Sequence, residues 1–225
     1  MTRFPARNKV PKFTIFASLL RMTAKYGPSD LREALVEDLK GAYPTRWEDF
    51  EAAKVLGKDI FGSPKPHPSA VLNLFTEQRI KFALPFAAYR AGLGGPSALA
   101  SERPGTVLPR LTLASIIHGM GRMGRFMTYI GPIFAYNSDL GVCTEAMCVL
   151  NVGTNRTEQR KEALNKISDA LVEQSGGDML SSLPLENLLC AGCAKLLKDG
   201  HRNCRREFVW AKLPSLLGWE SWEGV

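Results

Sequence analysis

Apolar residues recur at three- and four-residue intervals along much of this chain, which is the period of an amphipathic α-helix. The first such run covers residues 13–26, in which Phe16, Leu19, Leu20 and Thr23 fall at these intervals. Gly27-Pro28 is expected to end this helix. A second helix is predicted directly afterwards, capped by Asp30 with Glu33 at the third helical position.

A third helix is predicted to begin at Thr45, which forms a capping box with Glu48. This helix would bury Trp47 and Phe50. Residues 62–68 follow with the sequence GSPKPHP, whose prolines forbid both helix and sheet pairing. We therefore expect a rigid, extended loop there, and it is the best internal boundary before residue 70.

The rest of the chain also has a helical pattern. Two helices are expected within residues 69–91, with Pro85 tolerated near the first turn of the second one. Residues 92–109 are expected to form a flexible surface connection. Further helices are predicted over residues 111–129, 156–173 and roughly 185–212. Because no segment alternates like a strand, we predict an all-α, irregular multi-helix domain with no substantial sheet.

Composition and charge narrow the possible functions only a little. The 225 residues are 45% hydrophobic, which is ordinary for a globular protein with a substantial core. No apolar run approaches the roughly 20 residues of a membrane-spanning helix. The formal net charge of +7 suits an acidic partner. Since the basic residues are scattered through most of the chain, this charge permits nucleic-acid binding without requiring it.

The cysteines suggest a reducing compartment. Their number, five, is odd, and the sequence shows no secretory signal peptide. The basic opening of the chain resembles an organellar presequence in charge, but Pro5 and Pro11 would break its helix. We therefore expect a cytoplasmic or nuclear protein.

Several short motifs resemble one family when taken in order. Residues 19–26 (LLRMTAKY) with 31–35 (LREAL) are similar to the closing helices of a BTB/POZ domain. Four later segments resemble the C-terminal region of the large fungal BTB-domain protein family: Tyr43-Pro44-Thr45 with Trp47, Val71–Leu74, Ala83–Tyr89 and Trp210–Trp219.

The resemblance implies a division of the chain into three parts. Residues 1–12 would be a flexible basic N-terminus, residues 13–60 the last helices of a BTB domain, and residues 69–222 a C-terminal helical module. It also implies an adaptor-like protein that binds other proteins. The strands and early helices of such a domain would precede Phe13, and the sequence has no counterpart for them.

Four cysteines form a candidate zinc site, because two close pairs of thiolates can close a tetrahedral structural site. These are Cys143, Cys148, Cys190 and Cys193. A rival ligand set combines the second pair with His201 and Cys204, but on one continuous helix His201 would lie about 16 Å from Cys190. The alternative without metal is that all these thiols are small buried residues.

The sequence shows no catalytic set. Residues 119–124 match the dinucleotide fingerprint GxGxxG, but the residues before them are better interpreted as helix than as the strand that the fingerprint needs. His67 lies in the proline loop, His118 on an apolar helix and His201 in the basic tail, which does not resemble a catalytic arrangement. We therefore expect a non-enzymatic protein.

Two features near the C-terminus are candidates for partner binding. A predicted basic helical face comprises Lys195, Lys198, Arg202, Arg205 and Arg206. It would suit nucleic acid or an acidic protein, although Asp199 and Glu207 interrupt it and favour an ordinary solvated face. The apolar end with Trp219 and Trp222 is expected to pack back on the module, or else to anchor a partner.

Two hypotheses follow. The first is a protein-interaction module with one structural zinc and no other cofactor. The alternative is a nucleic-acid-binding regulator that uses the helix of residues 195–206.

Overall fold

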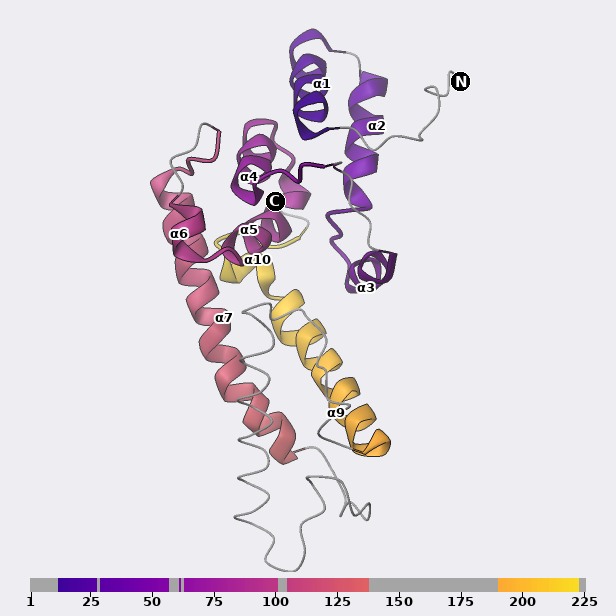
Figure 1. The fold of residues 1–225 in the computed structure, drawn as a ribbon, viewed down its shortest axis with the longest axis vertical. Coiled ribbons are helices and arrows are strands. Elements are labelled where there is room, and N and C mark those ends of the chain that lie inside the picture. Colours follow the sequence, from indigo (N-terminus) through magenta and orange to yellow (C-terminus); the bar gives the residue numbers. More distant parts are fainter. Residues whose placement is uncertain are drawn as a thin grey trace, which may run out of the picture. The chain divides into compact units, whose positions relative to one another are not determined.

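The computed structural model describes residues 12–27, 29–56, 61, 63–100, 105–137 and 190–222, and all structural statements concern these residues. Every regular element in them is helical, and no strand occurs among them, which confirms the predicted mainly α class (Figure 1). Contacts group the chain into two compact units, residues 1–118 with 213–225, and residues 119–212. The predicted division into residues 13–60 and 69–222 rests on a family resemblance, and it stays a prediction.

The first unit begins with a hairpin of α1 (Phe13–Tyr26) and α2 (Ser29–Lys40). Gly27 ends α1 as predicted, because its left-handed backbone (φ 77°) lets its N–H donate to the carbonyl of Thr23 at 3.0 Å. α2 begins at Ser29, so Asp30 lies in the first turn and not at the predicted cap. Its negative charge is still favourable there, because a helix carries partial positive charge at its N-terminus.

α3 (Trp47–Leu56) and α4 (Pro68–Glu77) supply aromatic side chains to the core of this unit. Trp47 and Phe50 are both buried, as predicted. α3 begins one residue later than a cap at Thr45 implies. The ring of Phe50 meets Phe86 edge-on at 5.7 Å between centroids, and Tyr43 meets Phe75 in the same way at 4.8 Å.

α4 packs against α5 (Leu84–Gly92), which follows a short 3₁₀ turn, η1 (Lys81–Ala83) (Figure 1). Pro85 occupies the first turn of α5, which confirms its predicted place. The proline loop is free of helix over residues 63–67, as predicted, but the prediction is wrong for Pro68, which begins α4. A proline fits the first helical position because its N–H would have no partner in the helix there. The prediction that residues 92–109 form a flexible surface connection is wrong in part, because residues 95–99 form the short helix α6 (Gly95–Leu99).

The C-terminal residues fold back onto the first unit. α10 (Leu213–Leu216) contacts α5, and both Leu213 and Leu217 are fully buried. This confirms the packing of the apolar end for Leu213 and Leu217, whereas partner binding by Trp219 and Trp222 stays a prediction. Gly218 then turns the backbone in the left-handed region (φ 95°), beside Ser115.

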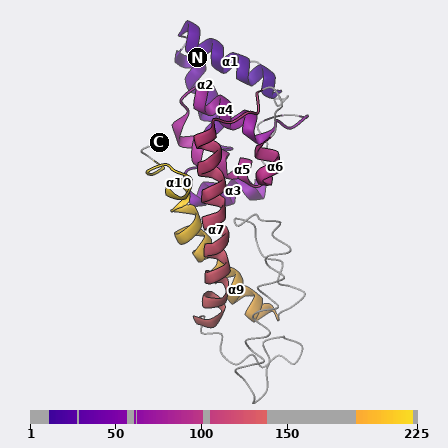
Figure 2. The ribbon, with the colours of Figure 1, turned by 90° about the vertical axis from the view of Figure 1, so that its left-hand side faces the viewer.

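α7 (Arg110–Asn137) is one uninterrupted helix that passes from the first unit into the second (Figure 2). The second unit also contains α9 (Ala191–Cys204), which continues directly into the π-helical segment η2 (Arg205–Trp210). The helix predicted over residues 185–212 is thus confirmed for residues 191–210. The helix predicted over residues 156–173 lies outside the described residues.

Candidate functional site

The second cysteine pair of the predicted zinc site lies at the beginning of α9. Cys190 is the residue before the helix and is half-buried, and Cys193 is buried one turn later. Because they are three residues apart at the start of a helix, the two thiols lie on the same side of it. Cys143 and Cys148 lie outside the described residues, so the four-cysteine site stays a prediction.

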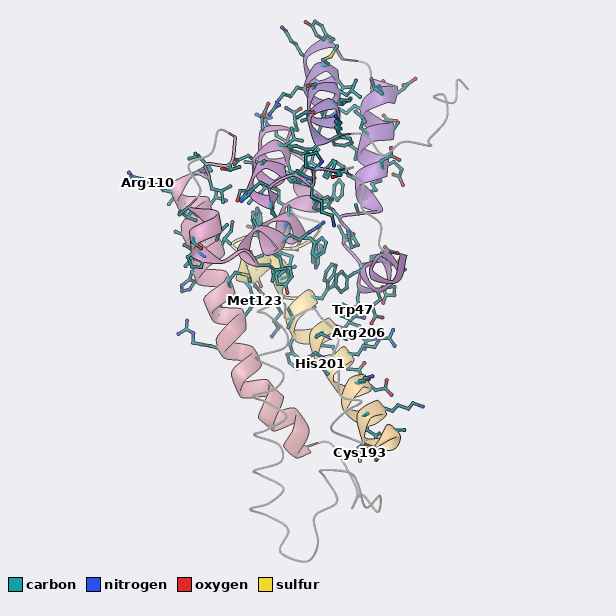
Figure 3. The ribbon with its side chains drawn as sticks, in the orientation of Figure 1. Trp47, Arg110, Met123, Cys193, His201 and Arg206 are labelled. Carbon is teal, nitrogen blue, oxygen red and sulfur yellow. The ribbon has the colours of Figure 1, made fainter. Side chains whose placement is uncertain are left out.

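The rival ligand set is not assembled. Gly200 lies inside α9 and does not break it, so the helix separates His201 from Cys190 by about 16 Å along its axis. Figure 3 shows Cys193 at the beginning of this helix and His201 well along it. Within the described ranges, no three side chains of His, Cys, Asp or Glu come together as a metal would require.

Cys204 lies at the opposite end of α9 from Cys190 and is buried. The pKa of its thiol is raised to about 11, mainly by burial and in smaller part by the nearby carboxylate of Glu207, against a smaller opposite effect of Arg205. In the absence of a metal the thiol is therefore neutral at physiological pH. Cys204 is a core residue.

The glycines of the GxGxxG match lie inside α7, residues 119–124, and no strand precedes them. A Cβ atom added at Gly121 would meet nothing within 4 Å. The match is thus an ordinary glycine-containing helix surface, as its sequence context indicates. His67 also has a structural role, because its Nδ1 accepts a hydrogen bond from the N–H of Ser69 at 3.3 Å and caps α4.

The predicted basic face is only partly present on the surface. Lys195, Arg202 and Arg206 are exposed, and Lys198 is half-buried. The prediction is wrong for Arg205, which is only 7% exposed. Arg205 keeps α-helical backbone angles (φ −59°, ψ −42°), so its burial comes from the packing around it, which the periodicity of the sequence does not show.

Acidic residues reduce the charge of what remains. Asp199 and Glu207 are exposed on the same helix, so against the four basic residues that reach the surface, Lys195, Lys198, Arg202 and Arg206, they leave a net +2. Arg206 donates to the carboxylate of Glu207 at 3.2 Å. Since affinity for nucleic acid grows with the number of phosphates neutralised, this face is weakly equipped for it. At the C-terminal end, Trp219 and Trp222 are half-buried.

A surface that the sequence did not indicate runs along α1. Three of its large apolar side chains are exposed, Ile15 by 53%, Met22 by 53% and Tyr26 by 68%. With half-buried Leu19 they are spaced by four, three and four residues, so they form one line along the helix. We name these four residues the α1 stripe. The inward side of α1 is separate and consists of Phe16, Ala17, Leu20 and Thr23.

The α1 stripe is held in a defined orientation. Phe61 meets the ring of Phe16 edge-on at 5.4 Å on the inward side of α1, and α2 packs against the same helix. On the surface, Lys25 places its ammonium group 5.2 Å from the centroid of the Tyr26 ring. α1 contains no acidic residue. The surface around the stripe is therefore apolar with basic residues beside it.

Comparisons of the chain with models of protein families, with curated proteins and with solved structures find no match. Among the described helices, none combines the length and the apolar character needed to cross a membrane.

Proposed function

We propose that this chain is a non-enzymatic protein-interaction module that binds a partner protein through the α1 stripe. The observation that carries the proposal is the alignment of three exposed apolar side chains on a helix whose other side is already packed. Single exposed apolar residues are normal on protein surfaces. A line from Ile15 to Tyr26 extends over about 16 Å of helix, which is a feature typical of interaction sites.

The chemistry of the stripe also suits recognition. Tyrosine and other aromatic residues are enriched among the residues that dominate binding energies, and methionine adapts to differently shaped partners. Here Tyr26 and Met22 lie one helical turn apart on the same line. The BTB/POZ resemblance of residues 19–35 supports the same proposal, because it implies an adaptor-like protein that works by binding others.

Zinc is part of the proposal as a structural element. The N-terminus of α9 carries partial positive charge, which favours anionic groups at Cys190 and Cys193. Two thiolates from this pair and two from Cys143 and Cys148 would complete a four-coordinate site with no open position for catalysis. Such a site would tie residues 143–193 into one loop.

A photo-crosslinking experiment tests the interaction function. Benzoylphenylalanine is introduced at Met22 of the full chain, in cells that produce the protein, and irradiation is expected to yield discrete crosslinked products. The matched control is Ala24, which is exposed on the opposite side of α1 and should yield none of them. Identical products from both positions, or none from Met22, would contradict the proposal.

The alternative of a nucleic-acid-binding regulator rests on Lys195, Arg202 and Arg206. It predicts binding that falls steeply with salt and that is lost when these residues are replaced. The small net charge of +2 on the surface side of that helix makes it the second candidate.

A further inference from the structure

We infer that the segment that occupies the α1 stripe is an amphipathic helix of another protein with acidic residues along its flank. This inference rests on the proposed function and names the chemistry of the partner. Three features of the first unit carry it: the spacing of the stripe, the absence of a sheet edge and the distribution of charge.

The spacing favours a helical partner. The four members of the stripe follow one another at intervals of four, three and four residues. Apolar rows of this kind pack best against a second helix with the same intervals, because the ridges of one helix fit the grooves of the other. A stripe of about three turns is long enough to align such a helix in one direction.

An extended partner has no comparable site. Binding of a strand by addition to a sheet needs unpaired backbone N–H and carbonyl groups at a sheet edge. The described residues contain no strand, and the backbone of α1 is occupied by its own helical hydrogen bonds. Side chains alone are available on α1, and they match the apolar side of another helix.

The charge of α1 selects an acidic partner. Its two charged residues are Arg21 and Lys25, and both are basic. Arg21 is engaged by Glu77, with 2.7 Å between the closest nitrogen and oxygen. The ammonium group of Lys25 lies 5.2 Å from the ring centroid of Tyr26 and so places a positive charge at one end of the stripe. The chain as a whole carries +7, which also attracts an acidic partner from a distance.

The same charges disfavour a second copy of this chain as the occupant. Pairing of α1 with α1 would bring Lys25 of both copies to one interface without any acidic residue from either helix. The neighbouring α2 does carry exposed carboxylates, at Asp30, Glu33, Glu37 and Asp38. Asp30, Glu33 and Glu37 lie on the side of α2 away from its buried Leu35 and Leu39, whereas Asp38 lies at the edge of that buried side. An acidic partner is therefore expected to place its carboxylates on the Lys25 side of the stripe.

Two synthetic peptides test the inference. Both are labelled amphipathic helices of four turns with identical leucines at alternating three- and four-residue intervals; one has glutamates on both flanks and the other lysines. Fluorescence anisotropy with the full chain is expected to show tighter binding of the glutamate peptide. Met22→Glu should abolish this binding, because it places a charge in the middle of the stripe.

Variants that change the charge of α1 test whether Lys25 contacts the charged flank of the peptide. Lys25→Glu is expected to lower the affinity for the glutamate peptide and to raise the affinity for the lysine peptide. Each change should be about threefold to fivefold, which is the effect of one exposed ion pair. Ala24→Glu is the matched control, because it adds a negative charge to the opposite side of the same helix. Circular dichroism of each variant verifies that it is folded.

The outcomes separate the two proposals. Equal binding of both peptides, or no binding of either, overturns the acidic-helix inference, while Met22-specific crosslinks would still support an interaction module. Self-association of the wild-type chain that Met22→Glu removes, seen by analytical ultracentrifugation, would also overturn the inference and assign the stripe to a second copy.

Discussion

Arg21 of α1 and Glu77 at the end of α4 form a two-armed ion pair across 56 residues of sequence. The Nε of Arg21 lies 2.9 Å from Oε1 of Glu77, and its terminal nitrogen lies 2.7 Å from Oε2. Next to it, a terminal nitrogen of Arg32 on α2 donates to the carbonyl of Gln78 at 2.8 Å. One arginine from each helix of the hairpin therefore attaches it to the same end of α4, which sets the direction in which the α1 stripe faces.

We predict that Glu77→Gln lowers the free energy of unfolding by only about 0.5–1 kcal/mol, because both partners are about half exposed. The hydrogen bonds from Arg21 are the main cause that lowers the pKa of Glu77 below its ordinary value of 4.5. A carboxyl group with a lowered pKa stabilises the fold above its unfolded-state pKa, and this contribution is lost as the pH falls through the lowered value.

Urea unfolding at pH 7 and at about pH 3 tests both parts of this prediction. The difference between wild type and Glu77→Gln should shrink at the lower pH. Glu37→Gln is a suitable control, because Glu37 pairs only with Lys40 one turn away on the same helix. An unchanged difference at both pH values would show that the ion pair contributes nothing to the stability.

Asn73 on α4 is predicted to be the more important polar residue. Its side-chain amide donates to the carbonyls of Gly105 and Val107, at 3.0 Å and 2.8 Å, and so holds the segment that leads into α7. Asn73→Asp keeps the shape but replaces the donor by an acceptor that faces two carbonyl oxygens. The expected loss is about 1–3 kcal/mol in the free energy of unfolding. Asn203→Asp, at an exposed position of α9, should change little.

Two glycines are predicted to respond in opposite directions to the same substitution. Gly218→Ala should destabilise the protein by about 1–2 kcal/mol, because φ is 95° there and the new Cβ would lie 3.4 Å from Oγ of Ser115. Gly121→Ala in the open surface of α7 should stabilise it by about 0.5–1 kcal/mol, since alanine is the better helix former. Thermal unfolding of both variants measures the difference, and equal effects would refute it.

Local sequence rules explain most of the helices correctly. Gly27 and Pro85 act through backbone angles of their own, so their effect on helix ends does not depend on the rest of the fold. The burial of Trp47 followed from its place in an amphipathic helix. These predictions succeed because the information lies within a few neighbouring residues.

The surfaces were harder to predict, because exposure depends on which neighbours are present. The spacing of Ile15, Met22 and Tyr26 is visible in the sequence, but periodicity alone does not show that α1 is apolar on two sides and covered on one of them. Arg205 shows the reverse case, a basic residue that is buried by packing. The sequence places His67 in a loop. That its side chain caps α4 can be seen only from the structure, which shows the direction of the side chain.

The zinc site gives the last prediction. Protein purified under reducing conditions without a chelator is expected to contain one zinc per chain, and Cys193→Ser should lose it with a fall in melting temperature. Cys204→Ala should keep the metal, because the unbroken helix α9 separates Cys204 from Cys193 by about 16 Å along its axis. Atomic absorption of the purified variants measures the metal content.

Alkylation by iodoacetamide, followed by mass spectrometry of the peptides, shows which thiols hold the zinc. Chelation should make Cys143, Cys148, Cys190 and Cys193 reactive together, because all four would lose the same ion. Cys204 should stay unmodified before and after chelation, since it is buried and protonated. If chelation exposed Cys204 with Cys190 and left Cys143 unchanged, the rival ligand set would be correct and α9 would have to break at Gly200. If no metal were present in the folded protein, the cysteines would be core residues and the loop of residues 143–193 would depend on packing alone.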